Sequence, residues 1–284
     1  LEPIIYIPDS EGNIRTQYGD GFYDTGDAEG WYDYFSDNWT FKGDITTQPN
    51  DKHSVKGGFE GRYTDMQVVD INAPWYGESG LGRNHDYFRV YPNDGAFYIQ
   101  DRITYDGMIV NIGLRYDYWF PGKFVDDAIK DSNTVTITDA ARVKYQDETF
   151  ELWGLRGKSH LSPRLGISHP VTDNDVLYLH YGHFSQQPKG QYVYAKLRST
   201  SEATYQLFGN PNLKPTTTVA YELGLKHRFN ANQTLEIKAY YKDMFDYPTA
   251  ATVRKFSPRY GNISFLMYVN MDYARARGIE MRFR

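Results

Sequence analysis

The chain has 284 residues, no cysteine and a formal net charge of −5. These values exclude a disulfide scaffold, a cysteine-ligated zinc site and the basic surface typical of nucleic-acid binding. No run of about 18 apolar residues occurs, which excludes a transmembrane helix but leaves a membrane β-barrel open, because only alternate residues of a barrel strand meet lipid. The first residues lack the features of a secretory signal, so an exported protein would have a precursor that starts before residue 1.

Residues 1–37 are rich in Asp, Gly and aromatic side chains and show no sustained period. We predict that they form a long loop. Its oxygen ligands would suit calcium, but the spacing of an EF-hand is absent, which favours a solvated acidic loop and leaves calcium binding by residues 9–37 open.

A period of two residues then predicts about nine strands. The clearest lie on either side of Asp106-Gly107, a pair typical of a type I′ hairpin turn. After this turn, apolar residues from Met108 to Tyr118 alternate with polar ones for about eleven residues, a length that suits a strand crossing a bilayer. The other strands are expected near residues 39–46, 55–63, 94–105, 164–168, 177–181, 219–229, 235–242 and 265–284.

One charge breaks the alternation. Asp101 falls on the apolar phase of residues 94–105, where a charge facing lipid is unfavourable. We expect a β-bulge there that shifts the phase of the strand.

The connections alternate in length. Short turns are expected near residues 48–52, 106–107, 170–174 and 230–233, and long irregular stretches at 1–37, 64–93, 119–161, 185–216 and 246–264. Outer-membrane barrels show this asymmetry, with short periplasmic turns and long extracellular loops. A sandwich or a propeller gives no reason for every second connection to be long.

The two phases of the strands differ in chemistry. Aromatic residues gather at the strand ends of the apolar phase, as in the two girdles of a membrane barrel. The opposite phase carries mixed charges that suit a wet lumen. The positions predicted to face the lumen are Arg62, Arg102, Arg115, Asp117 and Glu222.

Several stretches carry a family resemblance. They are residues 95–101 (GAFYIQD), 111–117 (NIGLRYD), 161–166 (LSPRLG) and 178–184, then GNPNLKP at 209–215 with YELG at 221–224, and finally Asn270, Ala274 and RGIE at 277–280. In this order the chain resembles the barrel of TonB-dependent outer-membrane receptors, especially those of Bacteroidetes-type bacteria. Thr216 stands where the family usually has Glu.

The resemblance implies an all-β, antiparallel transmembrane barrel of 22 strands with a plug domain. About nine strands cannot close such a barrel, so we expect a central-to-late part of a longer receptor in the bacterial outer membrane. Residues 1–37 would be an extracellular loop, and residues 38–284 a partial barrel without the plug. The implied partners are outer-membrane lipid, the remaining strands and plug of the receptor, and the TonB energy-coupling complex acting through the plug.

The implied function is active uptake of a scarce ligand whose identity the sequence does not give. The candidate ligand contacts, each of which could instead serve loop packing, are Trp31, Tyr32, Trp75, Tyr76 and Trp153. No catalytic, phosphate-binding or metal motif is present, so we expect no enzyme activity, no cofactor and no metal site. A passive porin and a soluble all-β binding or structural module remain the alternatives.

Overall fold

The computed structural model describes residues 6–8, 14–16, 30–72, 84–134, 136–197, 207–257 and 261–284. The chain divides into two compact units, residues 1–35 with 67–87 and residues 36–66 with 88–284. The first unit contains the short hairpin of β1 (Tyr6–Pro8) and β2 (Ile14–Thr16). The features below belong to the second unit, except that residues 30–35, 67–72 and 84–87 of the strands belong to the first.

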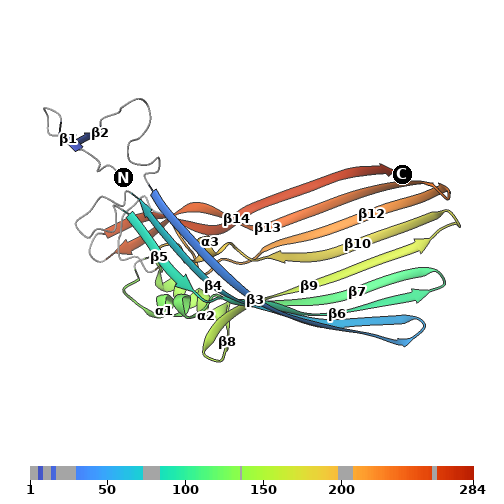
Figure 1. Ribbon diagram of the computed structural model, residues 1–284, viewed down its shortest axis with the longest axis horizontal. Helices are drawn as coiled ribbons and strands as arrows, with labels where there is room; N and C mark the ends of the chain where they lie inside the picture. Colours follow the sequence, from blue (N-terminus) through green and yellow to red (C-terminus); the bar gives the residue numbers. More distant parts are fainter. Residues whose placement is uncertain are drawn as a thin grey trace. The chain divides into compact units, whose positions relative to one another are not determined.

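Nine long strands form one antiparallel sheet in chain order, as predicted (Figure 1). They are β3 (Gly30–Asn50), β4 (His53–Asn72), β6 (Asn93–Tyr105), β7 (Met108–Phe120), β9 (Leu155–Pro170), β10 (Asp175–Gln186), β12 (Thr216–Asn230), β13 (Gln233–Ser257) and β14 (Gly261–Phe283). The short strands β5 (Asn84–Val90), β8 (Phe150–Leu152) and β11 (Leu207–Phe208) pair with β4, β9 and β14. The Asp106-Gly107 turn has φ values of 44° and 79°, as a type I′ turn requires.

All five predicted irregular stretches contain regular structure. Strand β4 runs on to Asn72 and β5 occupies part of 64–93, while 246–264 is largely the β13–β14 hairpin. Helices α1 (Lys123–Lys130) and α2 (Asp139–Asp147) fall in 119–161, and α3 (Gly190–Tyr194) falls in 185–216. Strand β3 begins at Gly30, inside the stretch 1–37 that was expected to be a loop.

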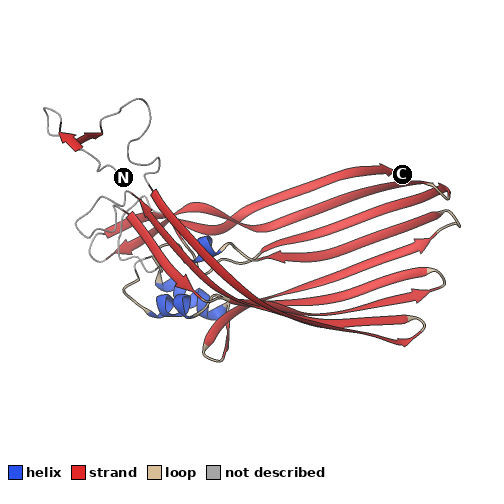
Figure 2. Cartoon of the chain, in the orientation of Figure 1, coloured by secondary structure: helices blue, strands red, loops and turns tan. Residues whose placement is uncertain are grey.

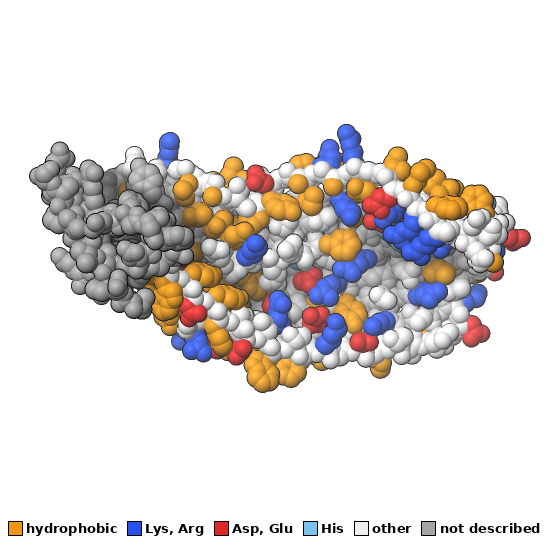
Figure 3. All heavy atoms as spheres, turned by 45° about the horizontal axis from the view of Figure 1, so that its top comes forward, with side chains coloured by type: hydrophobic (Ala, Val, Ile, Leu, Met, Phe, Trp, Pro, Cys, Tyr) orange, Lys and Arg blue, Asp and Glu red, His pale blue; other side chains and the backbone are white. Residues whose placement is uncertain are grey.

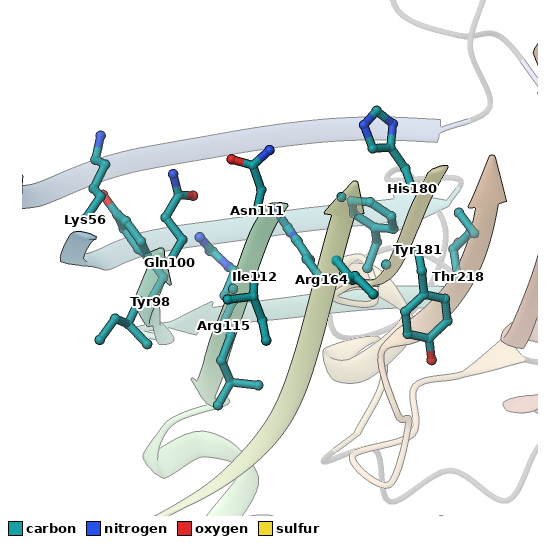
Figure 4. Close-up of a pocket in the computed structure, with 18 of the residues that line it drawn as sticks. Lys56, Tyr98, Gln100, Asn111, Ile112, Arg115, Arg164, His180, Tyr181 and Thr218 are labelled. Carbon is teal, nitrogen blue, oxygen red and sulfur yellow. The ribbon is translucent and has the colours of Figure 1, made fainter. Parts of the chain in front are cut away.

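The two faces of the sheet separate apolar from polar side chains. The outer face is defined here by large exposed side chains such as Ile99, Ile112 and Leu223. The inner face is defined by the alternate positions, including Gln100 and Asn111. Figure 4 shows this alternation, with Asn111 and His180 on one side of the sheet and Ile112 and Tyr181 on the other.

The expected bulge at Asp101 is wrong. Strand β6 pairs with β4 and β7 through this position without a shift, so that Asp101 lies between Val55 and Ile112 on the outer face. Its carboxylate is instead held by His53, whose Nδ1 lies 2.6 Å from Oδ2. A side-chain partner on the neighbouring strand therefore replaces the backbone irregularity.

Glycines on the inner face make room for rings from the next strand. Gly58 pairs directly with Tyr98, Gly224 with Tyr178, and Gly278 with Tyr240. A Cβ at Gly58 would lie 2.6 Å from Tyr98 Oη, and one at Gly278 would lie 2.8 Å from Tyr240 Oη. These glycines let the rings lie flat across the sheet, which fixes the register of the paired strands.

Buried side chains lie in the connections and in parts of several strands, including Phe88 in β5 and Phe265 in β14. The helices gather at the end of the sheet opposite the short turns (Figure 2). We call this group the loop cap; it comprises α1, α2, α3, β8 and residues 207–215. Its largest fully buried side chains include Tyr145, Tyr194, Phe208 and Leu213.

Candidate functional site

The inner face forms a hollow of about 930 Å³. Lys42, Lys56, Arg115, Arg164 and Glu222 contribute charge to it, together with amide and phenol groups. Figure 3 shows basic and acidic side chains gathered in this hollow. The surface is wet and charged while the opposite face is apolar, which is the division expected of a barrel wall around an aqueous lumen.

Ion pairs between neighbouring strands neutralise part of the charge on the inner face. Lys56 Nζ lies 3.0 Å from Asp44 Oδ1 in the hollow, and elsewhere on this face Lys238 Nζ lies 3.0 Å from Glu280 Oε2. Tyr178 donates a hydrogen bond of 2.7 Å to Glu236. Pairs this exposed to water contribute little to stability, so their main effect is to limit the net charge of the inner face.

The five residues predicted to face the lumen lie on the polar phase of their strands. Arg62 donates two hydrogen bonds to Asp94, of 3.0 and 2.9 Å, and Arg115 donates one of 2.7 Å to Asp117. Arg102 is paired in register with Ser54 and Asn111, and Glu222 with His180 and Tyr240. Arg115 and Glu222 line the hollow.

The aromatic candidates for ligand contact are spread over the chain. Trp31 and Tyr32 are exposed at the start of β3, in the first unit. Trp75 and Tyr76 lie outside the described residues. Trp153 is 93% exposed at the tip of the β8–β9 hairpin and has a φ of 51°, which is unusual for a bulky residue. A role for these residues in ligand binding stays a prediction.

Lys158 and the GNPNLKP motif form a contact that the sequence analysis missed. The Lys158 side chain is buried, and Nζ donates hydrogen bonds of 2.7 Å to Pro211 O and 2.8 Å to Leu213 O. Burial lowers the pKa of Lys158 to about 7. The motif therefore rests on the loop end of β9 through a lysine that no local sequence pattern marks.

The same motif is hydrogen-bonded to β14 and α2. Asn210 Nδ2 donates a hydrogen bond of 2.8 Å to Tyr268 O, and Asn212 Nδ2 donates one of 2.9 Å to Ala141 O. Asn270 Oδ1 accepts from Lys214 N at 2.8 Å, while Asn270 Nδ2 donates to Lys214 O at 3.1 Å. Residues 209–215 thus connect three parts of the chain that are far apart in sequence.

The cap has a second buried polar centre. Asp126 is nearly fully buried in α1, and its two carboxylate oxygens accept hydrogen bonds of 3.2 Å from Tyr145 Oη and from Arg156 N. Burial raises the pKa of Asp126 and also that of Tyr145. These hydrogen bonds join α1 to α2 and to the β8–β9 hairpin, so the parts of the loop cap are held together by polar contacts as well as by packing.

Within the described residues, no group of three or more His, Asp or Glu side chains is placed to hold a metal ion. No described helix is long and apolar enough to cross a membrane.

A family model described as "TonB dependent receptor-like, beta-barrel" matches residues 6–284. Three solved structures are similar. The siderophore receptor PirA of Acinetobacter baumannii is 18% identical, with 89% of this chain and 34% of that chain covered and a TM-score of 0.57. The ferric enterobactin receptor of Pseudomonas aeruginosa is 15% identical, with 87% of this chain and 33% of that chain covered and a TM-score of 0.57. The Serratia marcescens hemophore receptor HasR, bound to its hemophore and heme, is 16% identical, with 89% of this chain and 40% of that chain covered and a TM-score of 0.54.

The chain spans about a third of the length of the first two structures and two fifths of the third. At these identities the structures support the fold. Among curated proteins, none matches the chain.

Proposed function

The chain belongs to the family of TonB-dependent receptor β-barrels, and from that premise we propose that it supplies wall and outer loops to a receptor that imports a scarce ligand across the bacterial outer membrane by TonB-dependent active transport. The observation that carries this proposal is the sheet itself. Its strands alternate between an apolar outer face and a charged hollow, and its packed loop cap lies at the end opposite the short turns.

The edges of the sheet support a larger assembly. Strands β3 and β14 end the row of long strands, and among the described residues only the two-residue β11 pairs with the free side of β14. Unpaired backbone groups are not tolerated in lipid, so further strands would continue the wall on both sides. We propose that the same receptor supplies them together with a plug, through which the TonB complex acts. In this division residues 1–37 are an extracellular loop and residues 38–284 a partial barrel; the likeness to Bacteroidetes-type receptors stays a prediction.

The cargo is proposed only as a class. The similar structures are named for siderophores, ferric enterobactin and a heme-carrying hemophore. Chelated iron is therefore the first cargo to test. The long-loop side would capture it, with Trp153 as one exposed contact.

Matched cysteine substitutions in the full-length receptor test the orientation. Gln100→Cys and Asn111→Cys place a thiol on the inner face, and Ile99→Cys and Ile112→Cys place one on the outer face one residue away. The chain itself contains no cysteine. We expect a charged, water-soluble maleimide to label the first pair, and a lipid-soluble maleimide to be needed for the second. Equal labelling of all four by the charged reagent would contradict a membrane wall.

Transport assays separate the alternatives. Uptake of radiolabelled ferric chelate should stop when TonB is deleted or the proton-motive force is collapsed, whereas a passive porin would continue. A soluble all-β module would show no heat-modifiable migration on a denaturing gel and would stay in solution without detergent.

A further inference from the structure

Two histidine–aspartate pairs lie on the apolar outer face. His53 Nδ1 is 2.6 Å from Asp101 Oδ2, and His227 Nδ1 is 2.7 Å from Asp175 Oδ1. In each pair the two residues come from neighbouring strands, β4 with β6 and β10 with β12. The two histidine side chains are exposed to a similar extent, 38% and 36%. Ligand transport through the inner hollow uses neither pair.

Both pairs lie close to the short turns. His53 directly follows the turn between β3 and β4, and His227 lies within four residues of the turn between β12 and β13. Exposed aromatic rings accompany them. Tyr105 carries Lys52 Nζ 5.0 Å above its ring, and the Phe229 ring lies 4.4 Å from that of His227. Aromatic and basic side chains of this kind mark the level of lipid headgroups.

The aspartates determine what the histidines present to their surroundings. A carboxylate that accepts a hydrogen bond from Nδ1 fixes the orientation of the histidine ring. The Asp101 carboxylate depends on this contact, because its other oxygen, Oδ1, is buried and has no hydrogen-bond partner among the described residues. The second ring nitrogen of each histidine, Nε2, has no partner among the described groups of the chain. A ring that meets an anionic oxygen at each of its two nitrogens donates a hydrogen bond to both, so a fixed histidine at the headgroup level can bind the phosphodiester of a phospholipid.

We propose that His53 and His227, each held by its aspartate, bind the phosphate groups of phospholipids in the leaflet at the short-turn side. Lys52 adds a cation at the first site. The inference rests on the proposed function, because it needs the outer face to meet lipid. It gives the wall two fixed lipid contacts at one membrane interface, in addition to non-specific burial of its apolar band.

Native mass spectrometry of the full-length receptor tests this inference. The probes are dioleoyl phosphatidylethanolamine and, as a lipid without phosphate, dioleoylglycerol. We expect His53→Phe and His227→Phe each to remove one retained phospholipid and to weaken binding at that site roughly tenfold, the effect of one charge-assisted hydrogen bond. The phenyl ring keeps the aromatic volume at the interface. Asp101→Asn and Asp175→Asn should weaken binding in the same direction by freeing the ring.

His169 provides a matched control. It is exposed on the same face near a short turn, opposite Leu177, and no aspartate partner is recorded for it in the described residues. His169→Phe should leave lipid retention unchanged. Equal loss in all three histidine variants, unchanged retention in His53→Phe and His227→Phe, or equal retention of dioleoylglycerol would overturn the inference. Heat-modifiable migration on a denaturing gel shows separately whether each variant folds as a barrel. If the unmodified receptor itself lacks heat-modifiable migration, the proposed function fails, and this outcome is distinct from a failure of the lipid-binding inference.

Discussion

Substitution of Asn270 by alanine tests whether residues 209–215 join the loop cap to the wall. The Asn270 side chain lies on β14 and makes three hydrogen bonds. Two of them are the hydrogen bonds with the backbone of Lys214, and the third is a bond of 2.7 Å that Nδ2 donates to Asp246 O. Alanine removes all three and leaves the Lys214 N–H and two carbonyl oxygens without these partners.

The expected loss follows from these bonds. Each contributes about 0.5 to 1.5 kcal/mol, and partial exposure of Lys214 and Asn270 favours the lower end because water replaces part of the loss. Only the two bonds to Lys214 break when residues 209–215 open, so we expect the free energy of this opening to fall by about 1.4 kcal/mol. Where local opening controls exchange, amide hydrogens in this loop should exchange roughly tenfold faster.

Hydrogen–deuterium exchange of the full-length receptor in detergent measures this effect by peptide. Asn262→Ala is the matched control, since Asn262 lies on the same strand, is exposed, and makes no side-chain hydrogen bond to the part of the chain that the structure describes. Faster exchange confined to residues 207–216 and their contacts is the expected result. An unchanged rate in Asn270→Ala, or an equal rise in the control, would refute the reasoning.

Three further predictions concern the wall, the buried lysine and the hairpin tip. Gly58→Ala should destabilise the folded barrel in urea by about 1 to 3 kcal/mol, because its Cβ would overlap Tyr98. Gly57→Ala should be close to neutral, because the nearest heavy atom to its Cβ would be Tyr98 O at 3.7 Å. Folding lowers the pKa of Lys158 to about 7, so above that pH the unfolded chain binds more protons than the folded chain. The stability of the loop, measured by hydrogen exchange, should therefore rise from about pH 7 to about 9.5. In Lys158→Met this rise with pH should disappear. Trp153→Asn should keep or raise urea stability by up to about 1 kcal/mol, because Asn tolerates positive φ better, while reducing uptake of ferric chelate if Trp153 contacts it.

The wall was predictable because its physical signal is local. Alternation between lipid and water repeats every two residues, and Asp106-Gly107 identifies its turn from two residues. The strand ends were not predictable, because the alternation of apolar and polar residues fades beyond the apolar band. There, pairing with the neighbouring strand determines how far a strand continues. Strand β13 shows this, as it continues through Pro248 to Ser257 by pairing with β14 despite a register irregularity near Tyr247.

The missed contacts are long-range. Asp101 is 48 residues from His53, and Lys158 is 53 residues from Pro211, so nothing near either residue in sequence indicates its partner. Helix α1 was detectable in principle, since Val125, Ala128 and Ile129 recur at helical spacing and are buried. This signal covers only the eight residues of α1, a single short segment of the stretch 119–161.

The contacts of residues 209–215 restrict how the loop cap can move. This segment is bonded to β9 through Lys158, to β14 through Tyr268 and Asn270, and to α2 through Ala141. Opening any one of these loops alone would break contacts with the others, and the shared core would lose its apolar packing. We therefore expect the amide hydrogens of these segments to become exchangeable together.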